Sequence, residues 1–378
     1  MSSPPCVAVV LPSSEGFGPE AVGAIGMLVQ RLGAASGFAT VVIGADRTPA
    51  PFSVPAYRAA PGPAWLPVPR SVRYAIGVAD ALRRLRPSLI EVHNRPLLAG
   101  KLARRFPGTP TTLFLHNDPR GMRGMRSAAE RRALLGRLAR VVAVSEWVRS
   151  RLAEIEATDG LAETAARLLV LRNCIDLAGL PPPRSAAERS RRILYVGRIV
   201  PEKGPDRFIA ACARALPGLP GWRAEMLGAR RLRALRSRAA GRESAFEAGV
   251  RRAAEGAGIS LAGYRPHHEI LAAMAEAAIV VVPSRWEEPF GLTALEAMAS
   301  SAALICSPRG NLPALTGGAA LLADPDDPDA LAAAITELAR DPERRGGLGA
   351  AGRQRARCFD VPAVAASLDA LRRAVLDL

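Results

Sequence analysis

The sequence contains very little lysine and few aromatic residues. Of its 51 basic side chains only two, Lys101 and Lys203, are lysines. Aromatic residues make up 4% of the chain and hydrophobic residues as a whole 49%, so alanine, leucine and valine must fill its cores. We read the excess of arginine as a compositional bias and infer no function from it. That bias makes each remaining lysine conspicuous.

Cysteines are few and isolated. The five cysteines include no CxxC pair, and their odd number fits a reducing compartment better than a disulfide scaffold. We therefore expect a cytoplasmic protein, with association to the inner face of the cytoplasmic membrane as a further option.

Long apolar runs are also missing. No stretch of about 18 uncharged apolar residues occurs, so the sequence predicts no transmembrane helix. The opening residues, MSSPPCVAVVLP, place no basic segment before their short apolar run. This pattern is typical of a first β-strand rather than a signal peptide.

The chain has a strong excess of positive charge. A formal net charge of +16 indicates anionic partners such as nucleic acid, phosphates or an acidic membrane surface. A nucleic-acid surface is expected to interleave basic and aromatic side chains. The most basic runs, 118–142 and 229–242, contain no aromatic residue. We therefore predict no nucleic-acid partner, although a basic, non-enzymatic nucleic-acid-binding protein is kept as an alternative.

Short apolar runs alternate with helix-length segments on both sides of a proline-rich stretch at 180–192. The runs lie at 6–12, 38–46, 88–94, 111–118, 140–146 and 167–173, and at 193–198, 224–229, 259–264, 279–284, 303–307 and 320–324. Such runs predict parallel strands buried between helices. The two series predict an α/β protein with two doubly wound parallel-sheet domains. Three further helices are expected at 327–340, 342–357 and 361–376.

One lysine lies in a glycine-containing turn after a predicted strand. The stretch GRIVPEKGPDRF places Arg198 and Lys203 before an apolar-periodic helix. A strand-turn-helix unit gathers backbone N–H groups and the positive end of the helix at one point. Two added cations suit a diphosphate. The alternative is a surface ion pair among Arg198, Glu202 and Lys203.

A second motif, PSRWEEPFGLTALEAMA at 283–299, also follows an apolar run. Glu288 lies in the loop, and Glu296 lies about two turns into a strongly helical segment, beside its buried stripe. A carboxylate in that position must be paired or hydrogen-bonded. Either it binds ligand hydroxyls, or it forms a salt bridge to an arginine such as Arg285.

Together, GR-x4-KG and E-x7-E resemble the retaining glycosyltransferases of family 4, of the bacterial lipopolysaccharide and exopolysaccharide type. RNCID (172–176) and AVSEWVRSRL (143–152) resemble the same family, and the likeness is strongest over 190–330. It implies the GT-B fold, in which two Rossmann-like domains face a central cleft. The domains would span 1–176 and 177–357, with a C-terminal helix at 358–378 packing back on the first.

The resemblance also implies a role for each motif residue. Arg198 and Lys203 would hold the diphosphate of the donor. Glu288 would be a catalytic residue that contacts hydroxyls of the transferred sugar, and Glu296 would contact the ribose hydroxyls. The backbone N–H groups expected to cap the phosphates belong to Phe290, Gly291 and Leu292.

Two histidines end predicted strands in the first half of the chain. They are His93 and His116, and the resemblance places the functional histidine at His116, near the transferred sugar. The alternative for both is a structural contact with loop backbone. The other two histidines, His267 and His268, begin a helix and are expected at the surface.

The loop after the first strand reads SSEGFGPEAVG. It departs from a dinucleotide fingerprint because position 21 is alanine. We interpret Gly16 and Gly18 as letting backbone approach the donor diphosphate or the acceptor. The arginine-rich run 118–142 is either a solvated face or a surface for anionic lipid head groups or a lipid-diphosphate acceptor.

The stretch DPDDPD at 324–329 contains Asp-x-Asp, which is the metal signature of a different glycosyltransferase fold. Here it precedes a helical pattern, so we interpret Asp327 as the N-cap, Pro328 as the first helical residue and Asp329 as first-turn charge. We predict no metal, and no cofactor apart from the donor substrate.

The sequence thus predicts a retaining hexosyltransferase. It would move a sugar from a UDP- or GDP-linked donor to a hydroxyl of a glycan or lipid-linked acceptor, in the synthesis of cell-surface polysaccharide or lipopolysaccharide. The alternative enzyme is a GT-B epimerase acting on UDP-sugars, which needs further acid and base groups in the first half of the chain.

Overall fold

The computed structural model describes residues 4–19, 22–45, 50–158, 167–228 and 244–377. These residues form two compact units, which we call the N-terminal unit (Met1–Cys174 with Val361–Leu378) and the C-terminal unit (Ile175–Asp360). The sequence prediction placed the boundaries at 176/177 and 357/358, two and three residues away. The basic run at 229–242 lies outside the described residues.

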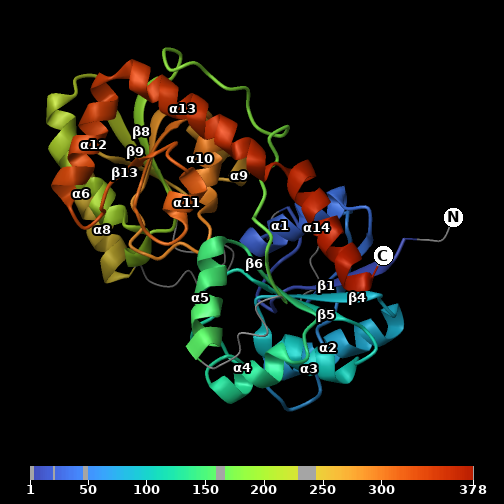
Figure 1. Ribbon diagram of the computed structural model, residues 1–378. Helices are drawn as coiled ribbons and strands as arrows, with labels where there is room; N and C mark the ends of the chain where they lie inside the picture. The colour runs from blue at the N-terminus through green and yellow to red at the C-terminus, as the bar shows by residue number, and fades with distance from the viewer. Residues whose placement is uncertain (1–3, 20–21, 46–49, 159–166, 229–243, 378) are drawn as a thin grey trace. The chain divides into compact units, whose positions relative to one another are not determined.

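The N-terminal unit is built on a seven-stranded parallel sheet in the order β3-β2-β1-β4-β5-β6-β7. Its strands are β1 (Cys6–Val10), β2 (Ala39–Gly44), β3 (Ala56–Ala59), β4 (Leu89–His93), β5 (Thr111–Leu115), β6 (Arg140–Ala143) and β7 (Leu168–Val170). Its helices are α1 (Ala24–Ala35), α2 (Arg70–Leu85), α3 (Pro96–Arg105), α4 (Ala128–Leu135), α5 (Glu146–Thr158) and α14 (Val361–Leu376). Helices α1 and α14 lie on one face of the sheet, and α2 and α3 lie on the other (Figure 1).

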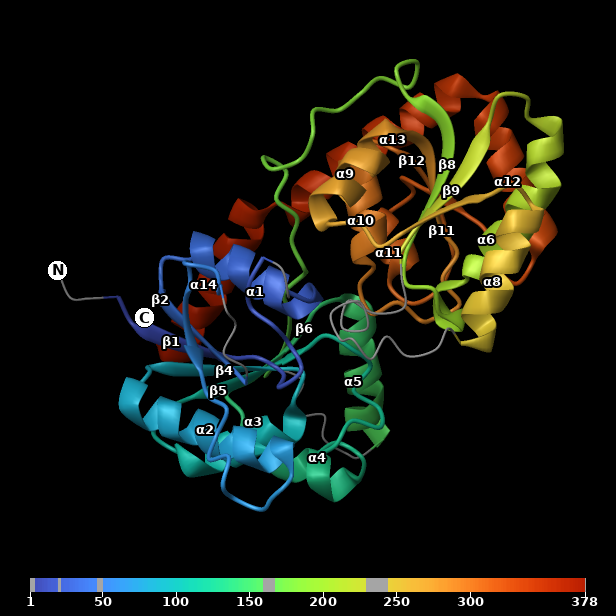
Figure 2. The same ribbon diagram turned by 180° about the vertical axis from the view of Figure 1, so that it is seen from behind.

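The C-terminal unit repeats this arrangement with six parallel strands in the order β10-β9-β8-β11-β12-β13. They are β8 (Ser190–Val196), β9 (Arg223–Leu227), β10 (Ser260–Gly263), β11 (Ala277–Val282), β12 (Ala303–Cys306) and β13 (Leu321–Leu322). The helices are α6 (Pro205–Ala215), α8 (Ala245–Gly256), α9 (His267–Glu276), α10 (Leu292–Ala299), α11 (Leu312–Thr316), α12 (Pro328–Arg340) and α13 (Pro342–Ala356). Side chains of α6, α8 and α12 share one core against the sheet, and α9, α10 and α13 cover its other face (Figure 2).

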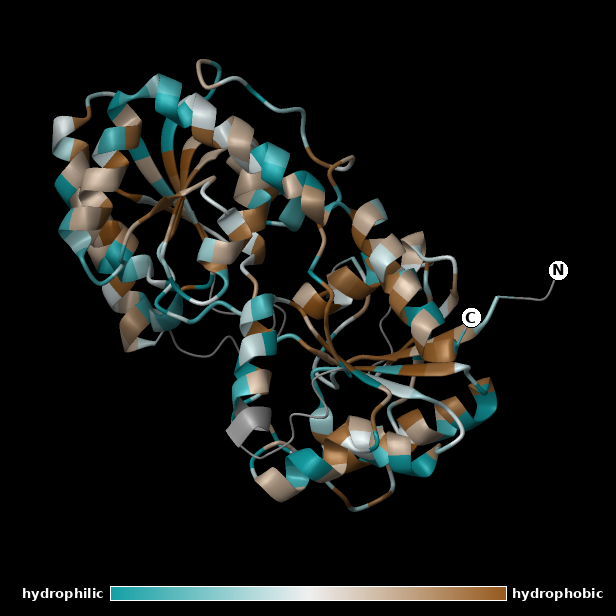
Figure 3. Ribbon diagram, viewed as in Figure 1, coloured by the Kyte–Doolittle hydropathy of each residue, from teal (hydrophilic) through white to brown (hydrophobic). Residues whose placement is uncertain are grey.

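Two buried sheets explain the hydrophobic pattern of the sequence. Strands β4, β5 and β11 are buried along their whole length, as strands covered on both faces must be. The central strands are accordingly hydrophobic in Figure 3. The predicted α/β fold class with two doubly wound parallel sheets is confirmed, and each of the predicted apolar runs overlaps a strand. One strand was missed, the short edge strand β3, whose residues alternate between exposed and half-buried.

Arginines bind the ends of several helices in the C-terminal unit. The buried Arg189 donates to the carbonyl oxygens of Met274 (3.2 Å), Ala277 (3.0 Å) and Ser300 (2.6 Å), at the C-terminal ends of α9 and α10. Arg345 similarly donates to the last carbonyl groups of α12. Burial, with a smaller contribution from Arg184, lowers the pKa of Arg189 to about 10. The planar guanidinium satisfies several unpaired carbonyls and the negative end of the helix dipole at once, which lysine cannot do in the same geometry.

Candidate functional site

The carboxyl ends of β8 and β11 place the two sequence motifs side by side. Lys203 ends a short 3-10 turn (Pro201–Lys203) between β8 and α6. The next residue, Gly204, has φ of 65°, and a Cβ atom there would lie 2.0 Å from the carbonyl oxygen of Pro283, after β11. Glycine is therefore required at this position, both by its left-handed conformation and by the close approach of the two loops.

An ion pair joins these loops. Lys203 Nζ lies 2.5 Å from Glu288 Oε1, and the Ser284 hydroxyl donates to the same carboxylate oxygen at 2.7 Å. The side chains of Lys203 and Glu288 are 25% and 10% exposed, so the pair is partly buried. The alternative in which Lys203 forms a surface pair with Glu202 is wrong, because its carboxylate partner is 85 residues away in sequence.

The loop that carries Glu288 is held by the loop after β12. The Asn311 backbone N–H donates to the Glu288 carbonyl at 2.8 Å, and the Asn311 side-chain amide donates to the Phe290 carbonyl at 3.1 Å. The Gly310 N–H donates to the Glu287 carboxylate at 2.7 Å. Because backbone and side-chain bonds fix it from both sides, this loop presents Glu288 in one orientation.

The second acidic residue of the motif, Glu296, lies on α10 and contacts α9. Its Oε1 lies 2.8 Å from His267 Nε2, at the first residue of α9. The two side chains are 14% and 32% exposed. Two expectations are corrected here. His267 is not a free surface residue, and Arg285 is not the partner of Glu296, because Arg285 pairs with Asp326 at 3.2 Å.

The remaining predicted residues of the C-terminal unit line the same edge of the sheet. Arg198 follows β8 with its side chain exposed. Gly291 is the N-cap residue of α10 with φ of 102°, and Leu292 is the first residue of that helix. Phe290 is buried and packs edge-on against Phe359 at 5.9 Å between ring centroids. Helix α10 therefore begins four residues after Glu288.

In the N-terminal unit, the two predicted histidines are in direct contact. His93 ends β4, His116 follows β5, and His93 Nδ1 lies 2.9 Å from His116 Nε2. Burial lowers the pKa of His116 to about 3. Burial, together with the neighbouring His116 and Arg372, also holds the pKa of His93 well below its usual value. Both imidazoles are therefore neutral at pH 7.

The glycine loop after β1 is anchored by the residue between its glycines. Phe17 is fully buried and stacks on Tyr57 at 5.4 Å between centroids. Gly18 is buried and Gly16 partly exposed. The Glu15 carboxylate accepts from the Gly26 N–H at 2.8 Å, which ties the loop to α1.

The aspartates at 324–329 have structural partners. Asp327 accepts from the backbone N–H groups of Asp329 (3.1 Å) and Ala330 (3.0 Å), and Pro328 is the first residue of α12, so the capping prediction is confirmed. Asp324 and Asp326 pair with Arg309 at 3.3 and 2.7 Å. Within the described ranges, no group of three or more His, Cys, Asp or Glu side chains is placed to hold a metal ion. The absence of a metal requirement stays a prediction.

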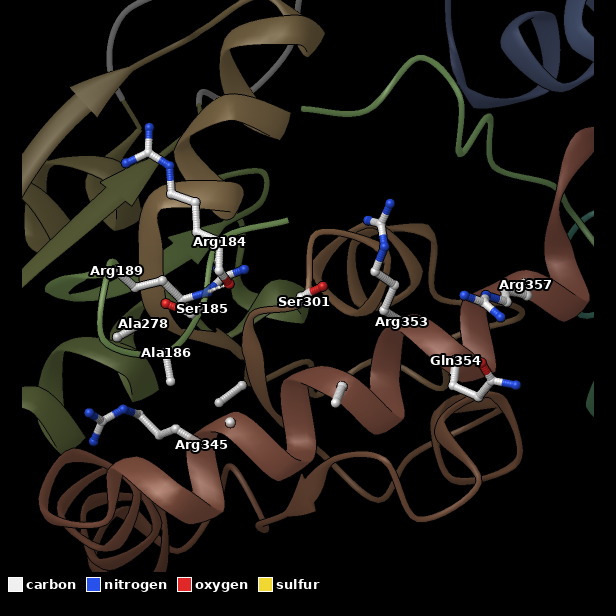
Figure 4. A pocket seen from close by; sticks show the side chains of 13 residues that line it. Arg184, Ser185, Ala186, Arg189, Ala278, Ser301, Arg345, Arg353, Gln354 and Arg357 are labelled. Carbon is white, nitrogen blue, oxygen red and sulfur yellow. Dashed lines mark hydrogen bonds between the residues drawn. The ribbon is translucent and has the colours of Figure 1, made fainter. Parts of the chain in front are cut away.

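Figure 4 shows a separate cavity of about 350 Å³ in the C-terminal unit. Its lining includes Arg189, Ala278 and Ala303, at the amino ends of β8, β11 and β12. The arginine side chains drawn there spread in different directions, and several donate to helix carbonyls. This cavity therefore lies at the opposite edge of the sheet from Lys203 and Glu288, and we assign it no ligand. No helix among the described residues is long and apolar enough to span a membrane.

In sequence comparison, each half of the chain matches a glycosyltransferase profile. Residues 25–178 match the profile of Glycosyltransferase Family 4, and residues 181–355 match that of Glycosyl transferases group 1. With its two Rossmann-like parallel-sheet units, the chain has the GT-B fold of such enzymes.

Individual relatives agree with this class. Glycogen synthase of Mycobacterium tuberculosis is 32% identical over 217 residues, which cover 53% of this chain and 46% of the relative. D-inositol 3-phosphate glycosyltransferase of Kineococcus radiotolerans is 32% identical over 258 residues, covering 63% and 58%. The chain thus matches about half the length of these curated relatives.

Two solved structures are similar over nearly their whole length. Sucrose-phosphate synthase from Thermosynechococcus elongatus has a TM-score of 0.75 at 20% identity, covering 99% of both chains. Anabaena HepE in complex with UDP and glucose has a TM-score of 0.76 at 16% identity, covering 97% of this chain and 99% of that one. At these identities the likeness establishes the fold alone.

Proposed function

We propose that this protein is a retaining hexosyltransferase that moves a sugar from a nucleotide-diphosphate donor to a hydroxyl of a glycan or lipid-linked acceptor. The observation that carries the proposal is the Lys203–Glu288 pair. It joins two loops at the carboxyl edge of the C-terminal sheet, where ligands of doubly wound sheets bind. The pair places a phosphate-binding cation beside an acceptor of hydroxyl hydrogen bonds.

In this proposal the donor diphosphate binds between Lys203, Arg198 and the start of α10. The ammonium of Lys203 has three N–H donors, so it can contact phosphate oxygens while keeping Glu288 as a partner. The backbone N–H groups around Phe290, Gly291 and Leu292 add the positive end of the helix dipole. The positive groups neutralise charge that builds up on the departing diphosphate.

The two carboxylates bind the hydroxyl groups of the donor. Glu288 is held by Ser284 as well as Lys203, so it remains oriented toward a sugar when the lysine turns to phosphate. Glu296 would accept from the ribose hydroxyls, with His267 fixing its carboxylate. Catalysis is then mainly positioning and electrostatic, and the leaving diphosphate takes the proton of the acceptor hydroxyl.

Residues of the N-terminal unit complete the proposal. His116 would hydrogen-bond the transferred sugar as a neutral imidazole, because its pKa of about 3 keeps it uncharged at pH 7. The Gly16 and Gly18 segment, anchored by buried Phe17, would bring backbone close to the diphosphate or the acceptor.

Exposed apolar side chains on the N-terminal unit support a lipid-linked acceptor. Trp65 is 81% exposed, and Ile76 of α2 and Leu97 of α3 are also exposed, on helices that end in arginines. Exposed apolar side chains on helices that end in cations suit the anionic face of a membrane. We therefore place the activity in cell-surface polysaccharide or lipopolysaccharide synthesis, at the inner face of the cytoplasmic membrane.

The donor is expected to be linked to UDP or GDP. One of the similar structures, Anabaena HepE, was solved in complex with UDP-glucose, which makes UDP-sugars the first donors to test. The experiment is release of UDP or GDP from a set of nucleotide sugars in the presence of lipid-linked and soluble glycan acceptors, with the product anomer assigned by NMR. Transfer with the donor's anomeric configuration supports the proposal.

Three outcomes contradict parts of it. Inversion at the anomeric carbon overturns the retaining mechanism. Loss of activity in EDTA with recovery on adding Mg²⁺ overturns metal independence. Conversion of a UDP-sugar to its epimer without any acceptor favours the epimerase.

A further inference from the structure

The C-terminal helix of the chain places a buried cation inside the N-terminal unit. Arg372 of α14 donates from Nε and Nη2 to the two carboxylate oxygens of Glu91 on β4, at 2.9 and 2.8 Å. The side chains of Arg372 and Glu91 are 1% and 2% exposed. Arg372 Nη1 also donates to the hydroxyls of Ser36 (2.7 Å) and Thr40 (3.3 Å). The fork of the guanidinium is thus satisfied on every side by β4, β2 and the end of α1.

A buried charge pair is a costly way to attach a helix. Removing two ions from water requires several kcal/mol per ion, and well-packed apolar residues usually stabilise such a contact as well or better. Helix α14 already has an apolar face, with Val364, Leu368 and Leu371 packed into a core with α1 and the sheet. The position of the pair therefore calls for an explanation besides stability.

That position is next to the histidine pair. Glu91 and His93 are two residues apart on β4, so their side chains are on the same face of the sheet. Glu91, His93 and Arg372 line one small cavity together with Phe114. The ring of His93 stacks on Phe114 at 4.6 Å between centroids, and its Nδ1 contacts His116.

The contact between the two imidazoles couples their tautomers. A neutral imidazole has one N–H donor and one bare nitrogen. If His93 Nδ1–H donates, His116 must carry its proton on Nδ1. If His116 Nε2–H donates instead, His93 carries its proton on Nε2, and His116 Nδ1 is bare.

Arg372 distinguishes the two arrangements. Besides burial, the titratable groups that act on His93 are His116, which follows β5, and Arg372 on α14, while Glu91 lies on its own strand. Both oxygens of Glu91 are engaged by Arg372, and the cation lowers the pKa of His93. Nδ1 of His93 is occupied by His116, so Nε2 is the ring nitrogen left to respond to the cation, which lines the same cavity. A nearby positive charge favours a bare nitrogen there.

We propose that Arg372, held by Glu91, is a positioning residue that fixes His93 as the Nδ1–H tautomer and so makes His116 present Nδ1–H as a hydrogen-bond donor. This inference rests on the proposed function for the role of His116 toward the sugar. It assigns the C-terminal helix a part in the chemistry. The helix determines whether the imidazole of His116 donates or accepts at Nδ1, the nitrogen that does not contact His93.

The sequence makes a direct test practical, because the chain has only four histidines. Long-range ¹H–¹⁵N NMR of protein labelled with ¹⁵N-histidine distinguishes the two ring nitrogens, and His→Gln variants assign each ring. The inference predicts that His116 is protonated at Nδ1 and His93 at Nδ1. Protonation of His116 at Nε2 in the wild-type protein overturns it.

The test needs a variant that removes the charge of Arg372 and keeps the protein folded. Arg372→Met alone leaves Glu91 buried and unpaired, so the main variant is Arg372→Met with Glu91→Leu, an apolar replacement of the kind that buried pairs tolerate. We expect a mixture of tautomers at His116, a fall in kcat/KM on the order of tenfold to a hundredfold, and a new inflection in its pH profile as the histidine pKa values rise. Arg373→Met, at the exposed neighbouring position, is the matched control.

The outcomes separate this inference from the proposed function. If the tautomers are unchanged in the double variant, the inference is wrong, whatever happens to turnover. If the tautomers change and turnover does not, the inference stands and the role of His116 in the proposed function is wrong. Arg372→Lys, which keeps the charge without the fork, should retain the wild-type tautomer.

Discussion

The two units of this protein share a topology and differ in what they place at its carboxyl edge. The two sheets have the same strand order around the first strand of each unit. The orders are β3-β2-β1-β4-β5-β6 and β10-β9-β8-β11-β12-β13, and the N-terminal unit adds β7 at the end. In the N-terminal unit that edge carries two neutral imidazoles in contact. In the C-terminal unit it carries a lysine, two glutamates and a histidine in two bonded pairs.

The difference follows from how deeply the ionisable side chains at each edge are buried. His93 and His116 are desolvated and therefore stay neutral, whereas Lys203 and Glu288 are partly exposed and compensate each other. Topology thus decides where functional residues gather, and the burial of the loops decides which charges they can keep. An anionic donor suits the charged edge, and a neutral hydroxyl suits the other. The predictions below test this contrast.

The largest effect is expected at Lys203. Lys203→Ala removes the cation aimed at phosphate and leaves Glu288 partly buried without its partner, so kcat/KM should fall on the order of a hundredfold to a thousandfold. Lys101→Ala changes the only other lysine, which is exposed on α3, and should leave turnover unchanged. Steady-state kinetics on both variants decides the point. Near-normal turnover of Lys203→Ala would remove the basis of the proposed function.

The neutral His116 of the N-terminal unit should make the free energy of unfolding depend on pH. The pKa of His116 is about 3 in the folded chain and near 6.5 in the unfolded chain. Between these values the unfolded chain binds more protons, so the free energy of unfolding falls as the pH falls from about 6.5 toward 3. His116→Gln should therefore lose less stability between pH 7 and pH 4.5 than the wild type does.

Urea unfolding at pH 7 and pH 4.5 measures the change in the free energy of unfolding for each protein. Comparing the variant with the wild type cancels the contributions of the other titrating groups. His268→Gln, at an exposed position, is the control and should behave as the wild type. If the free energy of unfolding changes equally with pH in His116→Gln and in the wild type, then folding does not hold His116 neutral.

A smaller effect is expected at the cap of α12. Asp327→Ala removes the acceptor for two backbone N–H groups and should lower the free energy of unfolding by about 1 kcal/mol, with little change in activity. Asp329→Ala, which removes an exposed first-turn charge and its surface ion pair with Arg214, should cost less. Thermal or urea unfolding measures both. A loss of activity in Asp327→Ala that Mg²⁺ restores would revive the metal-binding interpretation of DPDDPD.

The smallest effect is expected at His267, which supports Glu296. His267→Asn removes one hydrogen bond from the carboxylate, so the dissociation constant of the nucleotide should rise by roughly twofold to tenfold. The adjacent exposed His268→Asn should leave it unchanged. Calorimetric titration resolves this range. Equal affinity of both variants would mean that Glu296 needs no support from α9.

The sequence predicts the sheets well because their strands are buried on both faces. Apolar runs such as 277–282 carry that signal in the residues themselves. The edge strand β3 was missed because AYRA is short and half-exposed, and it lies in a proline-containing segment. Edge strands contact one neighbour only, so their residues need not be apolar.

The sequence motifs predict the site residues, but they do not predict the side chains with which those residues pair. The motifs indicate Lys203 and Glu288, yet nothing in the sequence states that residues 85 positions apart form an ion pair. His267 was interpreted as a surface residue because it begins a helix, and only the packing of α9 against α10 brings it to Glu296. Arg372 and Glu91 are 281 residues apart, and no local pattern marks their pairing.

The charged edge of the C-terminal unit is proposed to bind a nucleotide diphosphate. The most direct test is calorimetric titration of the protein with UDP and with GDP, repeated on Glu296→Ala and on the exposed Glu269→Ala of α9. One of the two nucleotides should bind with a roughly micromolar dissociation constant, Glu296→Ala should lose this binding, and Glu269→Ala should keep it. Binding that survives in Glu296→Ala, or no binding of either nucleotide to the wild-type protein, would contradict it.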